Sequence, residues 1–236
     1  MTVILQPNHL SDVLLHTQHD REVIRMAVQS PSLVNLLFYG PPGTGKTTLM
    51  RVSALEALRF RGLVVQDHKE AVAWGNVFEL DHNTGFSKAA LDKALSRMML
   101  ATLSSVDRRF VLLDEADSID PRSVNNVKKW LDRMSERDVQ VFAATNHLDR
   151  IDPAIRDRCL LIHMAAFSQA QMLLWLTKQV NAAGLPVPDE VRAVDMVNRS
   201  GGSMRNLRQE LQLYAFQCGA PTTPPPRLTI LPGGQV

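Results

Sequence analysis

The residues most suited to chemistry begin with a glycine-rich segment that ends in a lysine and two threonines. This segment matches the pattern GxxxxGK[ST] and directly follows the apolar run NLLFY. Glycines allow successive backbone N–H groups to turn toward phosphate oxygens at a helix N-terminus, where an anion is already favoured. In such a loop Lys46 reaches the β- and γ-phosphates, and the Thr47 hydroxyl holds Mg²⁺. The pattern predicts a nucleoside triphosphate site formed by Gly40, Pro41, Pro42, Gly43, Thr44, Gly45, Lys46, Thr47 and Thr48.

Two acidic residues form the second candidate group. Asp114 and Glu115 directly follow the apolar run Phe110–Leu113, and open α/β sheets bind ligands at the carboxyl ends of their strands. Asp114 could hold Mg²⁺ through its water shell, and Glu115 could polarise the attacking water as a general base. Alone, the segment could equally be the acidic start of a helix. Its pairing with the phosphate loop favours a catalytic role.

An asparagine provides the third candidate. Asn146 follows the apolar run Val141–Ala144, and its side chain could position the attacking water near the γ-phosphate. An asparagine after a strand is usually only a turn residue. Asn146 matters because it is the third polar group, in the right order, at the end of a predicted strand.

These side chains need a sheet to bring them together, and the sequence predicts one. Short apolar runs alternate with helical patterns, such as Thr48–Arg59, which is typical of a parallel sheet with crossover helices in an α/β fold. After Phe167 only helical patterns follow. We expect an α/β domain over 1–165, a small helical lid over 166–218, and an extended or disordered proline-rich tail over 219–236. The expected strands are Asn35–Tyr39, Val77–Leu80, Phe110–Leu113, Val141–Ala144 and, more weakly, Leu160–His163.

The overall composition is that of a globular protein with a core of ordinary size. The 236 residues are 45% hydrophobic and 21% charged, which excludes global disorder. No apolar run reaches the roughly 18–20 residues of a membrane span, and the N-terminus lacks a signal-peptide pattern. Cys159 and Cys218 are too few for a disulfide framework. We therefore expect a cytoplasmic protein that does not contact membranes, and because the formal net charge is only +2, any nucleic-acid surface must be local.

Together with further motifs, these residues resemble AAA+ ATPases and, among them, the small subunits of sliding-clamp loaders of the replication factor C type. The similarity runs over roughly residues 7–215. It includes residues 7–13, which resemble the motif near the adenine; VFELDHN at 77–83; LDEADS at 113–118; DPAIRDRC at 152–159, with Asp157 for the serine of the "SRC" box; and GSMRNLRQELQ at 202–212, with Ser203 for the aspartate of "GDMRxxLNxLQ".

The resemblance implies a P-loop NTPase fold, namely a five-stranded parallel sheet flanked by helices and followed by a helical lid. It also implies ATP as the nucleotide and roles for two arginines. Arg158 corresponds to an arginine finger, which is placed after the fifth strand and supplied to a neighbouring subunit, with Arg156 as its nearest competitor. Arg205 corresponds to a second sensor that reaches the same nucleotide from the lid. An arginine near the γ-phosphate can raise the rate by about 10³–10⁵.

A basic helix could contact DNA. Over Arg122–Met134 a period of 100° per residue places Val124, Val127, Leu131 and Met134 on one face, and Arg122, Lys129 and Arg133 on the opposite face. The pair formed by Lys128 and Lys129 occupies the place of a basic pair that lines the DNA-facing interior of clamp loaders. The alternative is an ordinary solvated face.

We expect an ATP-hydrolysing, clamp-loader-like DNA replication protein that works as a homo- or hetero-oligomer with DNA and a sliding clamp or another replication protein. The alternative is a helicase loader or a protein-remodelling ring. In a protein-remodelling ring, Phe86 after the second strand could be a pore-loop aromatic. A scaffold that only binds nucleotide is disfavoured by the complete set of catalytic candidates. Clamp-loader subunits ordinarily continue into a helical collar, so we expect assembly through the ATPase interfaces or a collar supplied by another chain.

Overall fold

The computed structural model contains a five-stranded parallel sheet, as predicted. It describes residues 7–15, 17–30, 34–81, 85–100, 109–136 and 138–220, so Asn83 and most of the predicted tail lie outside the described residues. The sheet has the order β2-β3-β4-β1-β5. In register, Phe38 of the central β1 lies opposite Ala144 on one side and Ile162 on the other. The strands are β1 Leu36–Tyr39, β2 Val77–Leu80, β3 Arg109–Leu113, β4 Val139–Thr145 and β5 Leu160–His163.

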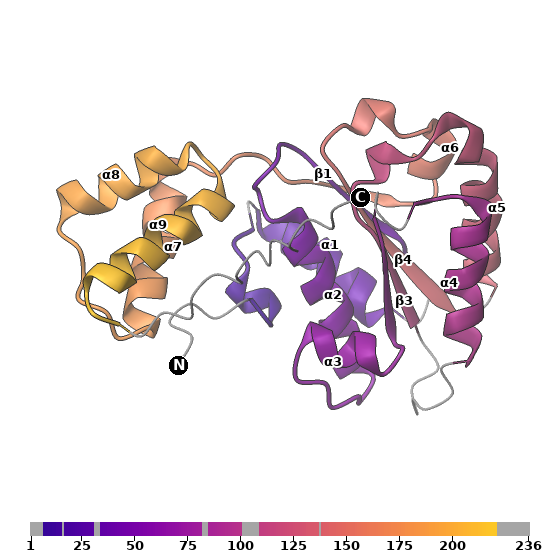
Figure 1. The fold of residues 1–236 in the computed structure, drawn as a ribbon, viewed down its shortest axis with the longest axis horizontal. Helices are drawn as coiled ribbons and strands as arrows, with labels where there is room; N and C mark the ends of the chain where they lie inside the picture. Colours follow the sequence, from indigo (N-terminus) through magenta and orange to yellow (C-terminus); the bar gives the residue numbers. More distant parts are fainter. Residues whose placement is uncertain are drawn as a thin grey trace, which may run out of the picture.

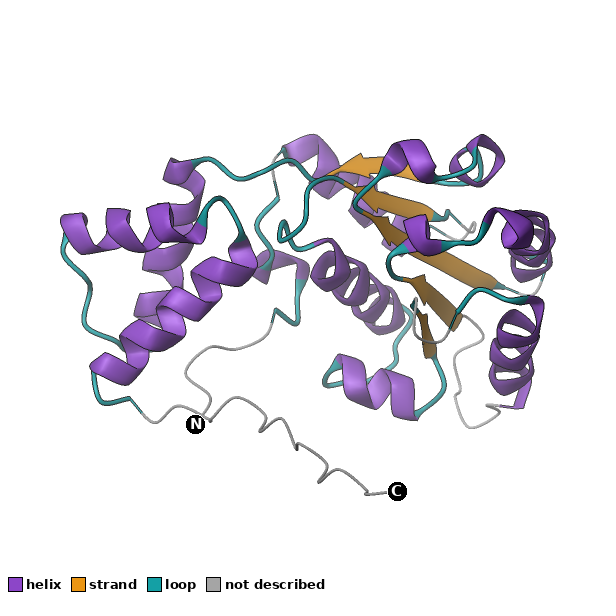
Figure 2. Cartoon of the chain, turned by 45° about the horizontal axis from the view of Figure 1, so that its top comes forward, coloured by secondary structure: helices purple, strands orange, loops and turns teal. Residues whose placement is uncertain are grey.

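Helices cover both faces of this sheet because successive strand side chains point to opposite sides. Phe38 packs with α1 (Gln18–Gln29), α2 (Lys46–Phe60) and α3 (His68–Ala73), whereas its neighbour Leu37 packs in a second core cluster on the other face. This second cluster includes residues of α4 (Lys88–Leu100), α5 (Val124–Ser135) and α6 (Pro153–Arg156). Figure 2 shows the strands between the two helical layers. The buried strands therefore read as continuous apolar runs.

Three helices form a separate bundle after the last strand, at one end of the molecule (Figure 1). They are α7 (Gln169–Ala182), α8 (Glu190–Ser200) and α9 (Met204–Gln217). Each begins at a capping side chain that accepts a hydrogen bond from the first turn: Ser168, Asp189 and Ser203, respectively. Their apolar faces meet in a core cluster of their own, which includes Trp175, Leu176, Leu207 and Leu211.

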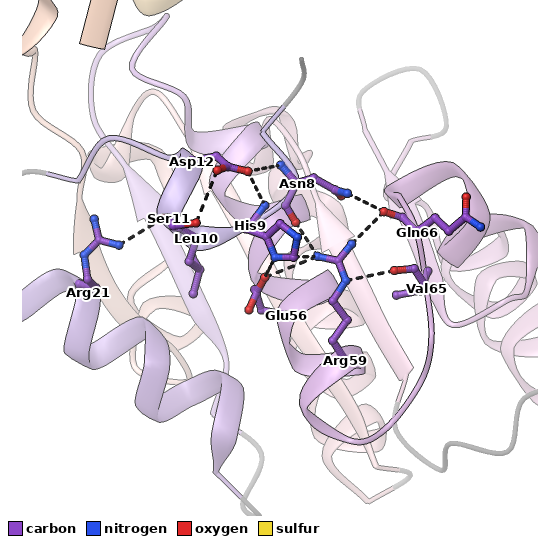
Figure 3. A network of polar contacts seen from close by, with 10 residues as sticks. All are labelled: Asn8, His9, Leu10, Ser11, Asp12, Arg21, Glu56, Arg59, Val65 and Gln66. Atoms are coloured by element: carbon purple, nitrogen blue, oxygen red, sulfur yellow. Dashed lines mark hydrogen bonds and ion pairs between the residues drawn. The ribbon is translucent and has the colours of Figure 1, made fainter. Parts of the chain in front are cut away.

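The N-terminal segment joins the two parts of the molecule. Arg59 of α2 donates hydrogen bonds to the carbonyl groups of Asn8 at 2.6 Å and Gln66 at 2.8 Å (Figure 3). The short 3₁₀ turn Leu10–Asp12 follows, and Lys178 of α7 donates to the carbonyl of Ser11 at 3.2 Å. The segment is thus attached to α2, the helix that follows the phosphate loop, and to the bundle.

The predicted basic helix begins later than expected. Pro121–Ser123 forms a 3₁₀ turn, and α5 starts only at Val124. The Asp120 carboxylate caps this turn by accepting a hydrogen bond from the Arg122 amide at 2.8 Å. Among the described residues, no helix is both long and apolar enough to cross a membrane.

Candidate nucleotide site

The phosphate loop joins β1 to α2 and is closely packed on two sides. Gly40 has φ +144°, and a side chain there would collide with the carbonyl of Met164, in the connection from β5 to α7. Gly43 has φ +82°, and a side chain there would collide with Ser203 of the bundle. Only glycine fits both positions, because each combines a positive φ with a close neighbour.

Lys46 lies inside this loop and is only 7% exposed. Its ammonium donates hydrogen bonds to the carbonyl groups of Gly40 at 2.8 Å and Pro41 at 2.7 Å. The Thr44 hydroxyl also donates to the Pro41 carbonyl, at 3.0 Å. Gly40, Pro41 and Thr44 therefore stabilise the loop and the lysine.

The charge of Lys46 is sensitive to its surroundings. Burial lowers its pKa to about 8; the carboxylates of Asp114 and Asp117 act in the opposite direction, and the guanidinium of Arg205 adds to the lowering. The cation is therefore held between acids at the strand ends and an arginine of the bundle. A bound phosphate would favour the charged form.

The carboxylate at the end of β3 meets the first turn of α2. The Thr47 hydroxyl donates to Asp114, with distances of 2.9 and 3.1 Å to the two carboxylate oxygens. The backbone amide of Glu115 donates to the same carboxylate at 3.0 Å. Magnesium prefers hard oxygen ligands, so a hydroxyl and a carboxylate in direct contact fit the predicted Mg²⁺ site.

A third carboxylate, which the sequence analysis left without a role, orients the asparagine. Asp117 accepts hydrogen bonds from the Thr145 hydroxyl at 2.7 Å and from the backbone N–H of Asn146 at 3.2 Å. Burial alone would raise the pKa of Asp117, but these hydrogen bonds outweigh it, and the pKa lies below its usual value. Asp117 thus ties the β3 turn to the end of β4. The signal was present in the LDEADS segment, where Asp117 lies two residues after Glu115.

Most of the predicted residues meet at one cavity of about 450 Å³. The phosphate loop forms one wall, the ends of β3 and β4 form a second, and α9 forms the third. Its lining includes Pro42, Gly43, Gly45, Lys46, Thr47, Thr48, Asp114, Glu115, Asn146 and Arg205. Glu115 has φ +53°, a left-handed conformation that is uncommon for a residue other than glycine. A nucleoside triphosphate would thus be surrounded from three sides.

The lid wall contains residues that sequence reasoning missed. Met204 donates its backbone amide to the Gly43 carbonyl at 2.9 Å, so α9 starts directly on the phosphate loop. Arg208, Gln209 and Gln212 then line the cavity beyond Arg205. The sequence signal for Arg208 was a departure from the "GDMRxxLNxLQ" motif, because an arginine stands where the motif has its first leucine.

Arg158 is not among the residues that line this cavity. It lies in the turn between α6 and β5, so the expectation that it follows the fifth strand was wrong. Its guanidinium donates to the two carboxylate oxygens of Asp132 in α5, at 2.8 and 3.2 Å, and to the Ala154 carbonyl at 2.6 Å. The Asp132 carboxylate raises the pKa of Arg158 still further, so the charge is permanent.

The candidate DNA residues divide into two groups. On α5, Val127, Leu131 and Met134 are buried and Val124 is half-buried, whereas Lys129 and Arg133 are exposed, which confirms the two predicted faces. Arg122 is exposed too, but it lies in the 3₁₀ turn before the helix. Lys128 differs, because its ammonium lies 3.5 Å from the Asp152 carboxylate at the start of α6. Lys128 therefore has a structural partner and offers less charge to a ligand.

Phe86 does not have the position of a pore-loop aromatic. It is only 5% exposed and packs in the core cluster beneath α4 and α5. The Ser87 hydroxyl accepts a hydrogen bond from the Ala90 amide at 3.3 Å. Local packing and capping therefore explain this segment, and the protein-remodelling alternative loses its supporting residue.

Comparison with known proteins agrees with this geometry. Residues 36–165 match the model of the "ATPase family associated with various cellular activities (AAA)". The chain is 25% identical over 213 residues to the replication factor C large subunit of Pyrococcus horikoshii, covering 88% of the chain and 41% of that protein. It is 26% identical over 212 residues to the probable replication factor C subunit 5 of Caenorhabditis elegans, covering 89% and 56%. The chain thus spans about half the length of such relatives.

The fold also resembles solved structures. The Holliday junction branch migration motor RuvB of Thermotoga maritima superposes with a TM-score of 0.66 at 15% identity, covering 92% of this chain and 68% of that one. At this identity the likeness supports the fold alone. It extends beyond the sheet to the helical bundle, because nearly the whole chain is covered.

Proposed function

This chain belongs to the AAA family of ATPases, and from that premise we propose that it binds and hydrolyses ATP as a subunit of a clamp-loader-like assembly on DNA. One observation carries the proposal: Lys46, Thr47, Asp114 and Asn146, which come from three separate segments of the sequence, line one cavity. The relatives named replication factor C, which match 88–89% of the chain, point to DNA replication.

The residues divide the chemistry among them. Lys46 and Arg205 supply positive charge to the phosphates, while Asn146, oriented through Asp117, positions the attacking water. Glu115 accepts a proton from that water as the general base. Thr47 and Asp114 would hold Mg²⁺, which when bound neutralises charge on the β- and γ-phosphates. Hydrolysis then depends on groups aligned by the phosphate loop, β3 and β4.

The proposal includes a division of labour between parts of the chain. The α/β domain over 1–165 would hold the nucleotide, and the helical lid over 166–218 would respond to it. Arg158 would complete the site of a neighbouring subunit, because it lies outside the cavity of its own chain. The exposed Arg122, Lys129 and Arg133 would contact the phosphates of the DNA backbone. A sliding clamp or another replication protein would be a further partner of the assembly.

The test is an ATPase assay with and without DNA, together with nucleotide binding. We expect Glu115→Gln to bind ATP nearly as well as the unaltered protein and to lose nearly all turnover, because the phosphate cradle remains and the base is removed. Lys46→Ala should weaken ATP binding itself. Turnover of Glu115→Gln at the parental rate would remove Glu115 from the mechanism, and absence of ATP binding by the unaltered protein would overturn the proposal.

A further inference from the structure

Arg51 and Glu79 form a half-buried ion pair, and the proposed chemistry gives neither residue a role. Arg51 of α2 donates hydrogen bonds to both carboxylate oxygens of Glu79 in β2, at 2.6 and 3.0 Å. The Nε2 atom of His68 in α3 lies 3.0 Å from the same carboxylate. Burial alone would raise the pKa of Glu79, but the hydrogen bonds from His68 and Arg51 outweigh it and hold the pKa at about 2. Glu79 therefore stays charged at neutral pH.

A second carboxylate lies on the same side of the sheet as Glu79. In register, Glu79 lies opposite Leu112 of β3, and Asp114 follows Leu112 by two residues. The pairing continues to Asp114, whose backbone amide donates to the Leu80 carbonyl at 2.8 Å. Side chains two positions apart in a strand share a face, and Leu112 packs in the core cluster that includes α2. Both carboxylates therefore face α2.

Arg51 is also placed near Asp114. It lies one helical turn beyond Thr47 on the same face of α2, and the Thr47 hydroxyl donates to Asp114 at 2.9 Å. The hydrogen bond to Glu79 raises the pKa of Arg51 against the effect of burial, and the charge of Asp114 adds to the rise. The guanidinium and Asp114 are therefore close enough to attract each other. A guanidinium readily binds a carboxylate through two parallel hydrogen bonds, so Arg51 could compete with a metal ion for Asp114.

The contacts of Glu79 prevent this competition. We propose that Glu79 is a positioning residue that holds Arg51 away from Asp114 and so leaves this carboxylate available to Mg²⁺. The proposal rests on the proposed function, because it requires that Asp114 takes part in a Mg²⁺ site. If Glu79 is neutralised, Arg51 keeps its charge, and Asp114 is the remaining acid whose charge it already senses. Removing the partner of a partly buried charge is costly, so Arg51 would pair with Asp114. Binding of Mg²⁺ would then require that this new ion pair breaks.

The experiment measures how strongly Mg²⁺ tightens nucleotide binding. Fluorescence polarisation with a labelled, slowly hydrolysed ATP analogue gives one Kd in excess Mg²⁺ and a second in EDTA, and their ratio expresses the contribution of the metal. We expect Glu79→Gln to lower this ratio about tenfold, as for other residues that orient metal ligands. Glu79→Gln/Arg51→Met should restore the ratio to within about twofold, because no guanidinium then competes for Asp114.

Two further variants serve as controls. Arg51→Met alone should leave the ratio equal or higher, because Asp114 stays available. Glu56→Gln makes the same substitution as Glu79→Gln but on α2, and its carboxylate also lies near an arginine and a histidine, with Arg59 at 3.5 Å and His9 at 2.8 Å (Figure 3). These partners belong to the contacts of the N-terminal segment, so Glu56→Gln should not change the ratio.

The outcomes separate this inference from the proposed function. An unchanged ratio in Glu79→Gln would overturn the inference, and so would equal losses in Glu79→Gln and the double variant, because the loss would then not depend on Arg51. A marked loss in Arg51→Met would also overturn it, and this variant tests the inference even if Glu79→Gln does not fold. If Mg²⁺ does not tighten nucleotide binding by the unaltered protein, the Mg²⁺ site of the proposed function is wrong as well. Circular dichroism of each variant verifies the fold.

Discussion

At the scale of single residues, Lys46 links nucleotide affinity to pH. Burial lowers its pKa to about 8, against 10.5 for an ordinary lysine. The folded protein therefore holds Lys46 charged below about pH 8 and increasingly neutral above it. Only the charged form can pair with phosphate oxygens, so ATP binding above pH 8 must be accompanied by proton uptake.

We therefore expect ATP affinity to be greatest below about pH 8 and to weaken by up to about tenfold per pH unit above it. The measurement is the dissociation constant of a slowly hydrolysed ATP analogue from pH 7 to 9.5 at saturating Mg²⁺. Lys46→Arg is the control, because a guanidinium stays protonated throughout this range; its affinity should show no such slope. Equal slopes for the two proteins would mean that another group titrates.

A second prediction at this scale concerns Asp117, which positions Asn146 without lining the cavity itself. Asp117→Ala removes the acceptor for the Thr145 hydroxyl and the backbone N–H of Asn146, and we expect kcat to fall about a hundredfold, as for other small misplacements of reacting groups. ATP affinity should change little. Asp117→Asn retains an oxygen acceptor and should recover most of the rate. Equal loss in both variants would show that the charge, rather than the positioning, matters.

At the scale of elements, the sequence predicted the strands closely and the helix contacts poorly. The strands are mostly apolar, and the inner strands β3, β4 and β1 are easily recognised because both faces of the sheet are buried there. The edge strand β5 is largely exposed, and its signal in the sequence is accordingly weaker. The partners of helical side chains depend on elements distant in the sequence. Lys128 follows the same helical pattern as Lys129, yet only Lys128 reaches Asp152. Periodicity could not reveal this, nor could it reveal that Arg208 faces the cavity.

The exposed charges of α5 lead to a prediction about DNA. Lys129→Glu/Arg133→Glu should weaken DNA binding and reduce its salt dependence, because each phosphate contact releases counterions. The matched control is Arg25→Glu/Lys69→Glu, which makes the same change of charge on α1 and α3, across the sheet from α5. Fluorescence anisotropy over a salt series measures both. Equal losses in the two proteins would indicate a general effect of net charge, and unchanged affinity would assign α5 to the solvated surface.

At the scale of the whole molecule, Arg158 is not among the residues that line the cavity of its own chain. Arg158 points elsewhere, and two hydrogen bonds to Asp132 with a third to Ala154 fix its orientation. A guanidinium held in this way can still present its remaining N–H groups to a phosphate of an adjacent subunit. Asp132 would thus position the finger before the subunits meet.

If Arg158 acts between subunits, turnover depends on association, and specific activity should rise with protein concentration over the range in which oligomers form. Arg158→Ala should bind ATP yet hydrolyse it poorly. Mixing it with Lys46→Ala should restore activity, because some interfaces then join an intact phosphate loop to an intact finger. In equal mixtures about a quarter of head-to-tail interfaces have this arrangement. Arg156→Ala should retain activity alone and need no such rescue. If mixed oligomers form and recover no activity, Arg158 acts within its own chain or only supports the structure.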